Sequence, residues 1–283
     1  MLRTLGSVFK LRIGVFVAIS AVAGALAQPG SAPSPGVIAA VAFATLLSAA
    51  SAGAFNHYYE RETDRNMART ANRPFATGAF TAGPAWLAVM AALLAGSVLL
   101  AAWSANLLAA AFVFLGAFVY GCVYTVWLKR RTVWNIVIGG LSGSFAVLAG
   151  AAIEPGLSPE ALILAVVLFL WTPPHFWSLA AALRDDYKAA GVPMLPVVMD
   201  DRRTGQIILA NTVALVAVSL LPPLFGAGML YLAAASIGGA WFIARSVAFA
   251  RAPSRATAMS NFFASLVQLS LLLAAVLIEA MLA

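Results

Sequence analysis

The chain has 283 residues, of which 63% are apolar and only 10% are charged. A soluble domain carries roughly a quarter charged residues, so the composition excludes an ordinary soluble protein and leaves membrane lipid as the solvent for most of the chain. The net charge of +7 would fit a nucleic-acid partner, but the placement of the basic residues, given below, argues against one. The single cysteine, Cys122, excludes an intrachain disulfide and a thiolate zinc cluster.

Nine apolar segments are long enough, or nearly long enough, to cross a bilayer, which takes about twenty residues. In chain order they are residues 13–27, 37–55, 82–103, 107–128, 134–153, 161–183, 204–224, 227–248 and 261–282. The first of them is short. The sequence therefore predicts an all-α integral membrane protein of about nine transmembrane helices, forming a single domain over residues 1–283.

The basic residues lie on one side of this predicted topology. All 17 lysines and arginines fall in the N-terminal segment and in or beside alternate loops, whereas the loops between them hold only Glu154 and Glu160. Basic loops stay in the cytoplasm, so we expect a cytoplasmic N-terminus, an outside C-terminus and no nucleic-acid partner. The start of the chain is too short and too weakly cationic for a transit peptide, which favours a bacterial inner membrane.

A first polar segment, residues 56–74, follows the second apolar segment. It places oxygen-bearing side chains four residues apart, at Asn56, Glu60 and Asp64, so they share one face if the helix continues. Such hard ligands suit Mg²⁺, which binds through a few carboxylates and substrate phosphates. Arginine forks for phosphate repeat at the same spacing, at residues 61, 65, 69 and 73. The alternative is a solvated helix carrying ion pairs.

A second polar segment, residues 184–196, follows the sixth apolar segment and carries two adjacent carboxylates, Asp185 and Asp186. They could hold a second Mg²⁺ or form an interfacial capping pair. Asp200 and Asp201 precede the seventh apolar segment, and we expect these two to cap its helix.

Two further places carry candidate residues. The fourth apolar segment ends with Tyr124 and the cations at 129–131, which are either a plain topology determinant or part of a phosphate cradle. His175 follows Pro173 and Pro174, which are predicted to break the sixth helix, and lies roughly 12 Å from its end. An ionisable group at that depth is a candidate site residue, with a packing histidine as the alternative. The other histidine, His57, is expected to face away from the metal ligands and to lie close to water.

These motifs resemble those of the UbiA-type intramembrane prenyltransferases, whose first box reads Asn-x-x-x-Asp-x-x-x-Asp. Within that family the chain is similar to the subgroup that farnesylates haem, through Met-x-Arg-Thr-x-x-Arg-Pro at 67–74, Thr-Pro-Pro-His-Phe at 172–176, and Asp-Tyr-x-x-Ala-Gly-Val-Pro-Met-Leu-Pro at 186–196. Two departures stand out. Glu60 replaces the usual aspartate, and the second segment has Ala189 and Ala190 where the wider family has the second aspartate of Asp-x-x-x-Asp.

The resemblance implies helices around an intramembrane chamber and a cytoplasm-facing site that transfers a farnesyl group from farnesyl diphosphate to a vinyl carbon of haem b, with addition of water. It implies Mg²⁺ as cofactor and a downstream haem A synthase or oxidase assembly as partner. The catalytic residues would be Lys129 and the metal ligands Asn56, Glu60, Asp64, Asp185 and Asp186. The substrate-binding residues would be Arg65, Arg69, Arg73, Tyr124, Lys129, Arg130, His175 and Tyr187.

Two other functions are compatible with the sequence. One is a prenyltransferase with another acceptor, such as an aromatic acid or chlorophyllide, which the runs at 172–176 and 191–196 disfavour. The other is a secondary transporter. Transporters carry their ion-coupling residues near the middle of the membrane, whereas most of the acids here lie in polar segments between the helices.

Overall fold

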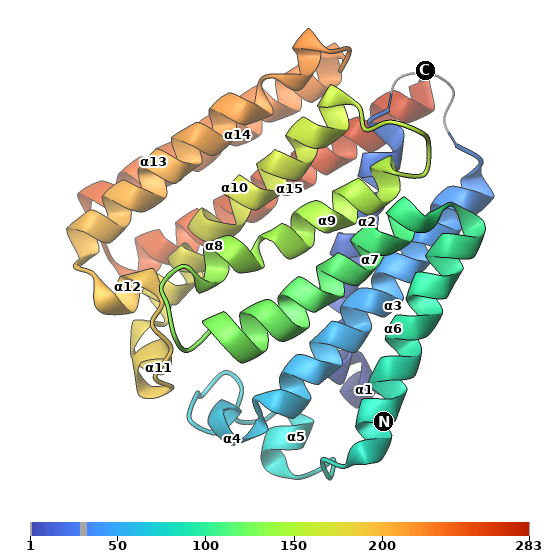
Figure 1. Ribbon diagram of the computed structural model, residues 1–283. Helices are drawn as coiled ribbons and strands as arrows, with labels where there is room; N and C mark the ends of the chain where they lie inside the picture. Colours follow the sequence, from blue (N-terminus) through green and yellow to red (C-terminus); the bar gives the residue numbers. More distant parts are fainter. Residues whose placement is uncertain (1, 29–32, 283) are drawn as a thin grey trace.

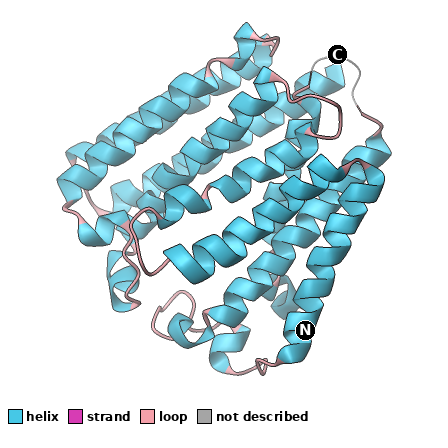
Figure 2. Ribbon diagram, in the orientation of Figure 1, coloured by secondary structure: helices cyan, strands magenta, loops and turns pink. Residues whose placement is uncertain are grey.

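The computed structural model describes residues 2–28 and 33–282, and these residues form helices and connecting loops without a strand (Figure 1, Figure 2). The first half contains α1 (Leu2–Val8), α2 (Leu11–Leu26), α3 (Pro35–Tyr59), α4 (Arg61–Asp64), α5 (Pro74–Thr77), α6 (Pro84–Ser104), α7 (Leu107–Phe118) and the π-helical stretch η1 (Val119–Leu128). The second half contains α8 (Asn135–Gly139), α9 (Leu141–Ala151), α10 (Pro159–Ala182), α11 (Arg184–Ala189), α12 (Leu195–Val198), α13 (Asp201–Ser219), the 3₁₀ turn η2 (Pro222–Leu224), α14 (Met229–Arg251) and α15 (Arg255–Leu282).

Seven helical segments among the described residues are long and apolar enough to cross a membrane. They are Pro35–Tyr59, Pro84–Ser104, Leu107–Leu128, Pro159–Ala182, Asp201–Leu224, Met229–Arg251 and Arg255–Leu282. Two shorter apolar segments, Leu11–Leu26 and Asn135–Ala151, correspond to the other two predicted spans. The prediction of an all-helical, multi-pass membrane protein is confirmed.

The long helices pack side by side in a closed ring. In ring order, each helix contacts the next through α2, α3, α6, α7, α9, α10, α13, α14 and α15, and α15 returns to α2. The C-terminal ends of α3 and η1 meet the short helices α4, α5, α11 and α12 at one end of the ring, which we call the carboxylate end (Figure 1). The opposite end holds the C-terminal ends of α2 and α15, the start of α10, and η2.

Three helices that lead to the carboxylate end are capped where they begin. The hydroxyl of Ser34 accepts a hydrogen bond from the backbone N–H of Val37 at 3.4 Å, and that of Ser158 accepts one from Ala161 at 3.0 Å. At the start of α7 the amide oxygen of Asn106 accepts one from the backbone N–H of Ala109, at 2.9 Å. These caps satisfy N–H groups that the first helical turn leaves free, so they fix where α3, α7 and α10 begin.

Two glycines allow α2 and α9 to cross at close range. A Cβ atom on Gly150 would overlap the backbone carbonyl of Ala21, and one on Gly24 would overlap that of Val147. Small residues let membrane helices approach until their backbones touch. This crossing brings α9 to the inside of the ring, where its glycines and alanines form part of a cavity wall.

The predicted break of the sixth apolar helix is wrong. α10 runs without interruption from Pro159 to Ala182, with Pro173 and Pro174 inside it. Proline removes a backbone donor, but packing on both sides of the site holds the helix together: α10 contacts α9, α13 and α15, and the indole N–H of Trp171 donates to the carbonyl of Ser265 on α15 at 2.7 Å.

The predicted span 134–153 is in turn two helices, α8 and α9, with Gly140 between them. A Cβ atom on Gly140 would lie 2.9 Å from the Cβ of Thr172, so the glycine allows this junction to pack against α10. The sequence does not reveal such a junction, because the residues on both sides of it are equally apolar and read as one continuous span.

Candidate active site

The first polar segment continues the helix of α3 beyond its last turn. The backbone N–H of Glu60 donates to the carbonyl of Asn56 at 3.0 Å, and that of Asp64 donates to Glu60 at 2.8 Å. The helical spacing therefore holds, and the three side chains are only 2, 2 and 3% exposed. For these residues the alternative of a solvated helix is wrong. It describes Glu62 instead, whose carboxylate pairs with Arg61 and Arg65 at the surface.

Two cations pair with the carboxylates of this group. The ammonium of Lys129, which follows η1, pairs with Oε2 of Glu60, and a guanidinium nitrogen of Arg73 lies 2.8 Å from Oδ2 of Asp64. The amide nitrogen of Asn56 donates to the same Oε2 at 2.8 Å. The predicted residues Asn56, Glu60, Asp64, Arg73 and Lys129 therefore form one cluster.

Lys10 is a member of this cluster that sequence reasoning missed. Its ammonium donates to Oδ1 of Asn56 and to the hydroxyl of Tyr120, both at 2.7 Å. Its backbone has a φ of 49°, the left-handed conformation, at the corner between α1 and α2. Tyr120 and Thr125, whose hydroxyl accepts from the Asn56 amide at 3.1 Å, were missed as well. A lysine at the start of an apolar helix reads as a topology determinant, so the sequence gives no separate signal for its role.

The cluster has more positive than negative charge. Burial lowers the pKa of Lys10 well below its usual value, and the neighbouring Arg73 and Lys129 lower it further, against Glu60 and Asp64. Burial also lowers the pKa of Lys129, while its pairing with Glu60 raises it. Three cations face two carboxylates, and this imbalance favours binding of an anion.

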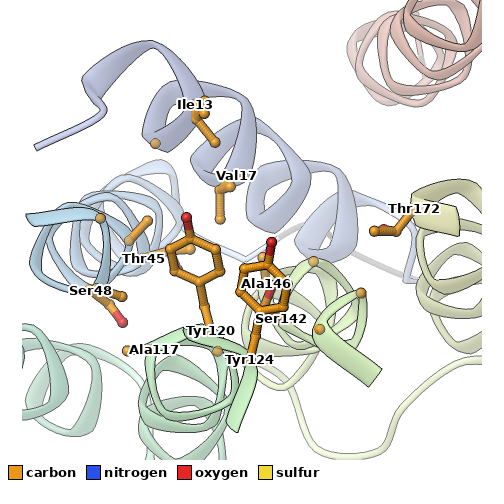
Figure 3. A pocket seen from close by; sticks show the side chains of 18 of the residues that line it. Ile13, Val17, Thr45, Ser48, Ala117, Tyr120, Tyr124, Ser142, Ala146 and Thr172 are labelled. Atoms are coloured by element: carbon orange, nitrogen blue, oxygen red, sulfur yellow. The ribbon is translucent and has the colours of Figure 1, made fainter. Parts of the chain in front are cut away.

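The π-helical stretch η1 turns two tyrosines towards the interior of the ring. The N–H of Lys129 donates to the carbonyl of Tyr124, five residues back, at 2.9 Å, and such wide turns are frequent at functional sites. The rings of Tyr120 and Tyr124 stack with centroids 5.6 Å apart. Figure 3 shows them side by side, both pointing from η1 into a cavity.

This cavity has a volume of about 220 Å³ and extends from Lys10 and Tyr120 into the ring of helices. Its deeper walls are largely apolar and made mostly of small residues, including Gly116, Gly143 and Ala146. A polar mouth and an apolar interior suit an amphiphile whose charged head stays at the carboxylate end.

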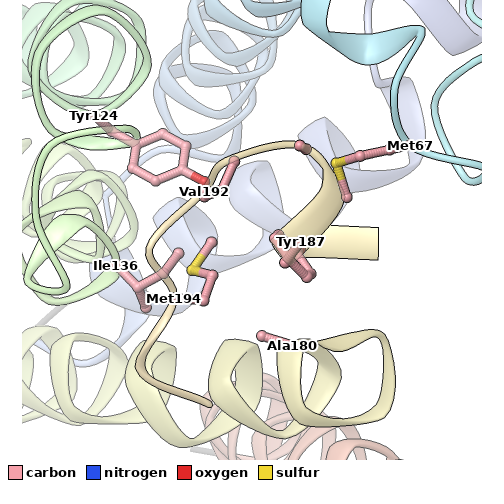
Figure 4. Packing of buried hydrophobic residues seen from close by; sticks show 8 residues of the cluster. Met67, Tyr124, Ile136, Ala180, Tyr187, Val192 and Met194 are labelled. Carbon is pink, nitrogen blue, oxygen red and sulfur yellow. The ribbon is translucent and has the colours of Figure 1, made fainter. Parts of the chain in front are cut away.

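The second polar segment covers the first. The guanidinium of Arg69 donates to the hydroxyl of Tyr187 on α11 at 3.3 Å. Figure 4 shows Met67 from the first segment close to Tyr187 and Met194 from the second, in one buried cluster that includes Tyr124. Burial raises the pKa of Tyr187, against the lowering effect of Arg69 and Arg73. The predicted residues Arg69, Tyr124 and Tyr187 therefore lie together beside the charged cluster.

The structure does not bring Asp185 and Asp186 into this cluster. Asp185 is exposed, Asp186 is half-buried, and neither carboxylate forms an ion pair within the described part of the chain. Within residues 2–28 and 33–282 no three His, Cys, Asp or Glu side chains gather as a metal site would require. The second metal site remains a prediction.

Asp200 caps α13 as expected, because its carboxylate accepts a hydrogen bond from the backbone N–H of Arg203 at 2.9 Å. Asp201 was expected to cap the same helix, but its carboxylate pairs with Arg184 instead.

Two predicted phosphate ligands lie at the edge of the site. Arg65 donates from Nε to the carbonyl of Ala76 at 2.7 Å and pairs with Glu62, so its guanidinium holds the first polar segment against α5. Arg130 is exposed and forms no ion pair with the residues that the structure describes. For both residues a phosphate contact remains a prediction.

His175 lies beside the cavity. Its ring stacks between Trp171 and Phe262, with centroids 4.1 and 4.5 Å away, and its Nδ1 lies 2.7 Å from the hydroxyl of Ser265. Trp171 also lines the cavity, so His175 lies directly behind one cavity wall.

The expectation that His57 lies close to water is wrong, because this residue is only 3% exposed. α3, whose last turn carries His57, contacts η1, α4 and α5.

The buried carboxylates suit a hard cation. Oε1 of Glu60 is inaccessible to solvent and has no hydrogen-bond partner among the described residues. An oxygen in that state carries an uncompensated desolvation cost, which a bound cation would remove. With Asp64 and the amide oxygen of Asn56 it offers the oxygen ligands that Mg²⁺ prefers.

Comparison with known proteins finds relatives along the whole chain. The "Protoheme IX farnesyltransferase 2" of Paramagnetospirillum magneticum is 68% identical over 283 residues, covering 100% of this chain and 98% of that protein. The fold matches a structure of digeranylgeranylglyceryl phosphate synthase with a TM-score of 0.83 at 19% identity, over 100% of this chain and 99% of that one. It also matches a UbiA homologue from Archaeoglobus fulgidus bound to DMAPP and Mg²⁺, with a TM-score of 0.67 at 18% identity, over 95 and 98% of the two chains.

Residues 17–271 match the UbiA prenyltransferase family, a span that includes Asn56, Glu60 and Asp64, both tyrosines of η1 and the second polar segment. The chain therefore belongs to the UbiA prenyltransferase family.

Proposed function

We propose that this protein transfers the farnesyl group of farnesyl diphosphate to a vinyl carbon of haem b, with addition of water, giving haem O and diphosphate. The observation that carries the proposal is the buried cluster of Asn56, Glu60 and Asp64 with three cations, placed at the mouth of an apolar cavity. The similarity over the whole chain to a protein named protoheme IX farnesyltransferase supports haem as the acceptor.

The first step of such a reaction is breakage of the allylic C–O bond, in which diphosphate leaves with the bonding electrons. Lys10, Lys129 and Arg73 lie where they would bind the departing phosphate oxygens, and their fixed positions stabilise the charge as it develops. Asn56, Glu60 and Asp64 would hold Mg²⁺, with Asp185 or Asp186 as the proposed ligands of a second ion. When bound, Mg²⁺ supplies further neutralisation of the diphosphate.

The cavity would hold the farnesyl chain. Its lining is largely apolar below Lys10 and Tyr120, and such walls would keep water away from an allylic cation formed there. The stacked rings of Tyr120 and Tyr124 present their π-faces and hydroxyls at the point where the head group meets the chain. Aromatic faces attract a cation, so these rings would stabilise positive charge on the first carbons of the prenyl group.

His175 is the proposed haem contact. The hydrogen bond between Nδ1 and Ser265 leaves Nε2 as the free ring nitrogen, and a partner on one nitrogen orients the other for ligation. A neutral imidazole held in this way would bind the haem iron as an axial ligand and present a vinyl group to the cavity. Trp171, which stacks on His175 and lines the cavity, would separate the porphyrin from the prenyl chain.

We further propose the membrane arrangement that the loops indicate. Nine spans, counting the shorter segments Leu11–Leu26 and Asn135–Ala151, would put the N-terminus in the cytoplasm and the C-terminus outside. The carboxylate end would then lie at the cytoplasmic face of a bacterial inner membrane. A downstream haem A synthase or an oxidase assembly pathway would then receive the haem O product.

The test is to incubate the purified full-length protein with farnesyl diphosphate, Mg²⁺ and haem b, and to identify the haem product by mass. We expect haem O and one diphosphate per haem consumed. Diphosphate release that is unchanged when haem b is omitted, together with unmodified haem b, would overturn the proposal in favour of another acceptor.

A further inference from the structure

A second cavity lies at the end of the ring opposite the carboxylate end. It has a volume of about 590 Å³ and is bounded by the C-terminal ends of α2 and α15, the first turn of α10, and the turn that joins η2 to α14. Most of its lining is apolar, as at Leu164 and Val276. Two of the five acidic residues outside the two polar segments, Glu160 and Glu279, also line it.

Two polar groups in this cavity lack partners. Oε2 of Glu160 is inaccessible to solvent, and neither it nor the hydroxyl of Tyr231 forms a hydrogen bond within the described part of the chain. The Tyr231 side chain is 1% exposed, and its residue lines the cavity. Buried polar atoms are nearly always paired, and an unpaired carboxylate is among the most costly of them. Both groups therefore indicate a missing ligand.

Glu279 has a structural task that Glu160 lacks. Its two oxygens accept hydrogen bonds from the backbone N–H groups of Gly228 and Tyr231, at 2.9 and 2.8 Å, and so cap the start of α14. This leaves Glu160 as the free anion. Gly226, with a φ of 127°, lets the Glu160 carboxylate approach the turn, because a Cβ atom there would lie 3.2 Å from Oε1.

The charge of the lining selects the kind of ligand. Among the described residues that line the cavity there are two carboxylates and no lysine, arginine or histidine. A cation would compensate the carboxylate of Glu160, whose Oε2 is buried without a partner among the described residues. A bare divalent metal ion is a poor fit, since it needs several oxygen ligands and Glu279 already uses both of its oxygens on the backbone. An ammonium group on an apolar body satisfies both the anion and the apolar walls.

We propose that this cavity binds the primary ammonium group of an amphiphile, with Glu160 as its ion-pair partner and the Tyr231 hydroxyl as a second hydrogen-bond acceptor. The apolar part of the ligand lies against Leu164, Val276 and the end of α2. This site is separate from the prenyl-transfer site, which lies at the other end of the ring, and does not depend on the identity of its substrates.

The test titrates the purified full-length protein with decylamine and, separately, with decanol, following the shift in melting temperature. We expect a dissociation constant for decylamine at least tenfold lower than for decanol. In E160Q that preference disappears, and in Y231F decylamine binds several-fold more weakly. The matched control is E154Q, which changes an exposed acid at the same end that does not line the cavity and should bind like the unmodified protein.

Equal affinities for the amine and the alcohol, or unchanged decylamine binding in E160Q, would overturn the proposal. The elution volume of each variant and its melting temperature without ligand show whether it is folded. Native mass spectrometry after reconstitution in bilayers with phosphatidylethanolamine or phosphatidylcholine identifies the source. Retention of the ethanolamine lipid by the unmodified protein and its loss in E160Q indicates a lipid head group, whereas decylamine binding without a retained lipid indicates a soluble amine.

Discussion

The ammonium of Lys10 donates to the amide oxygen of Asn56 across 46 positions of sequence, at 2.7 Å, and so ties the corner between α1 and α2 to the end of α3. The same ammonium contacts the hydroxyl of Tyr120 on η1. One lysine therefore joins three segments at the point where the charged cluster opens into the cavity. Its left-handed backbone conformation is maintained because these contacts fix the side chain.

This geometry predicts that Lys10→Met lowers farnesyl transfer at least tenfold, chiefly through weaker binding of farnesyl diphosphate, because a cation facing the diphosphate is lost. Haem affinity, measured by absorbance titration, should change little. Arg12→Gln is the matched control, since it removes an exposed cation two residues away and should retain activity. A Lys10→Met enzyme with unchanged KM and kcat would exclude Lys10 from the site.

Asp64→Ala is predicted to reduce haem O formation more than tenfold, about 1.4 kcal/mol of transition-state stabilisation, because it removes a carboxylate ligand and leaves Arg73 unpaired. Glu60→Asp should be nearly silent, because it keeps the charge. Glu62→Gln is the matched control. It changes an exposed acid that lies two residues from both Glu60 and Asp64, and it should also be active. Product assays on purified variants decide this, and more than a tenth of the normal rate in Asp64→Ala would contradict the Mg²⁺ assignment.

His175→Ala is predicted to weaken haem binding and stop haem O synthesis while leaving Mg²⁺-dependent farnesyl diphosphate binding intact. The Soret band of bound haem should lose the features of imidazole ligation. Ser265→Ala, which removes only the partner of Nδ1, should weaken haem binding to a smaller extent. If His175→Ala lowered the affinities for haem and for farnesyl diphosphate equally, His175 would have a packing role, because its ring fills the space between Trp171 and Phe262.

Gly150→Ala is predicted to destabilise the protein by about 1–3 kcal/mol or to prevent its folding, because the added methyl group overlaps the backbone of α2 at Ala21. Gly96→Ala is the matched control. It lies in α6 with no atom within 4 Å of the added Cβ, so it should be neutral or slightly stabilising. Melting temperatures of the two variants in one detergent test this, and equal values would show that the crossing of α2 and α9 tolerates separation.

The proposed topology predicts the behaviour of reporter fusions. An enzyme that is active only outside the cytoplasm should be active when fused at the C-terminus and inactive when inserted at Asn72, an exposed position in the first polar segment. An inactive C-terminal fusion would show that one of the two short segments, Leu11–Leu26 or Asn135–Ala151, does not cross the membrane.

The sequence by itself determined the helical membrane class, the positions of the long apolar helices and the placement of the oxygen-bearing side chains at 56, 60 and 64 on one helical face. These features are local. Hydrophobic length sets a membrane span, and a spacing of four places side chains on one face for as long as the helix continues. Charge placement likewise predicts an orientation, since each loop is judged by its own residues.

Only the tertiary structure decided which cations meet these three side chains. Lys10, Arg73 and Lys129 come from three separate segments, and no local pattern distinguishes them from Arg65 and Arg130, which lie at the edge. The continuity of α10 through Pro173 and Pro174 was decided in the same way, because packing against three neighbouring helices outweighs two missing backbone donors. These long-range contacts depend on how the helices pack into a closed ring, and that packing cannot be predicted from residue spacing or composition.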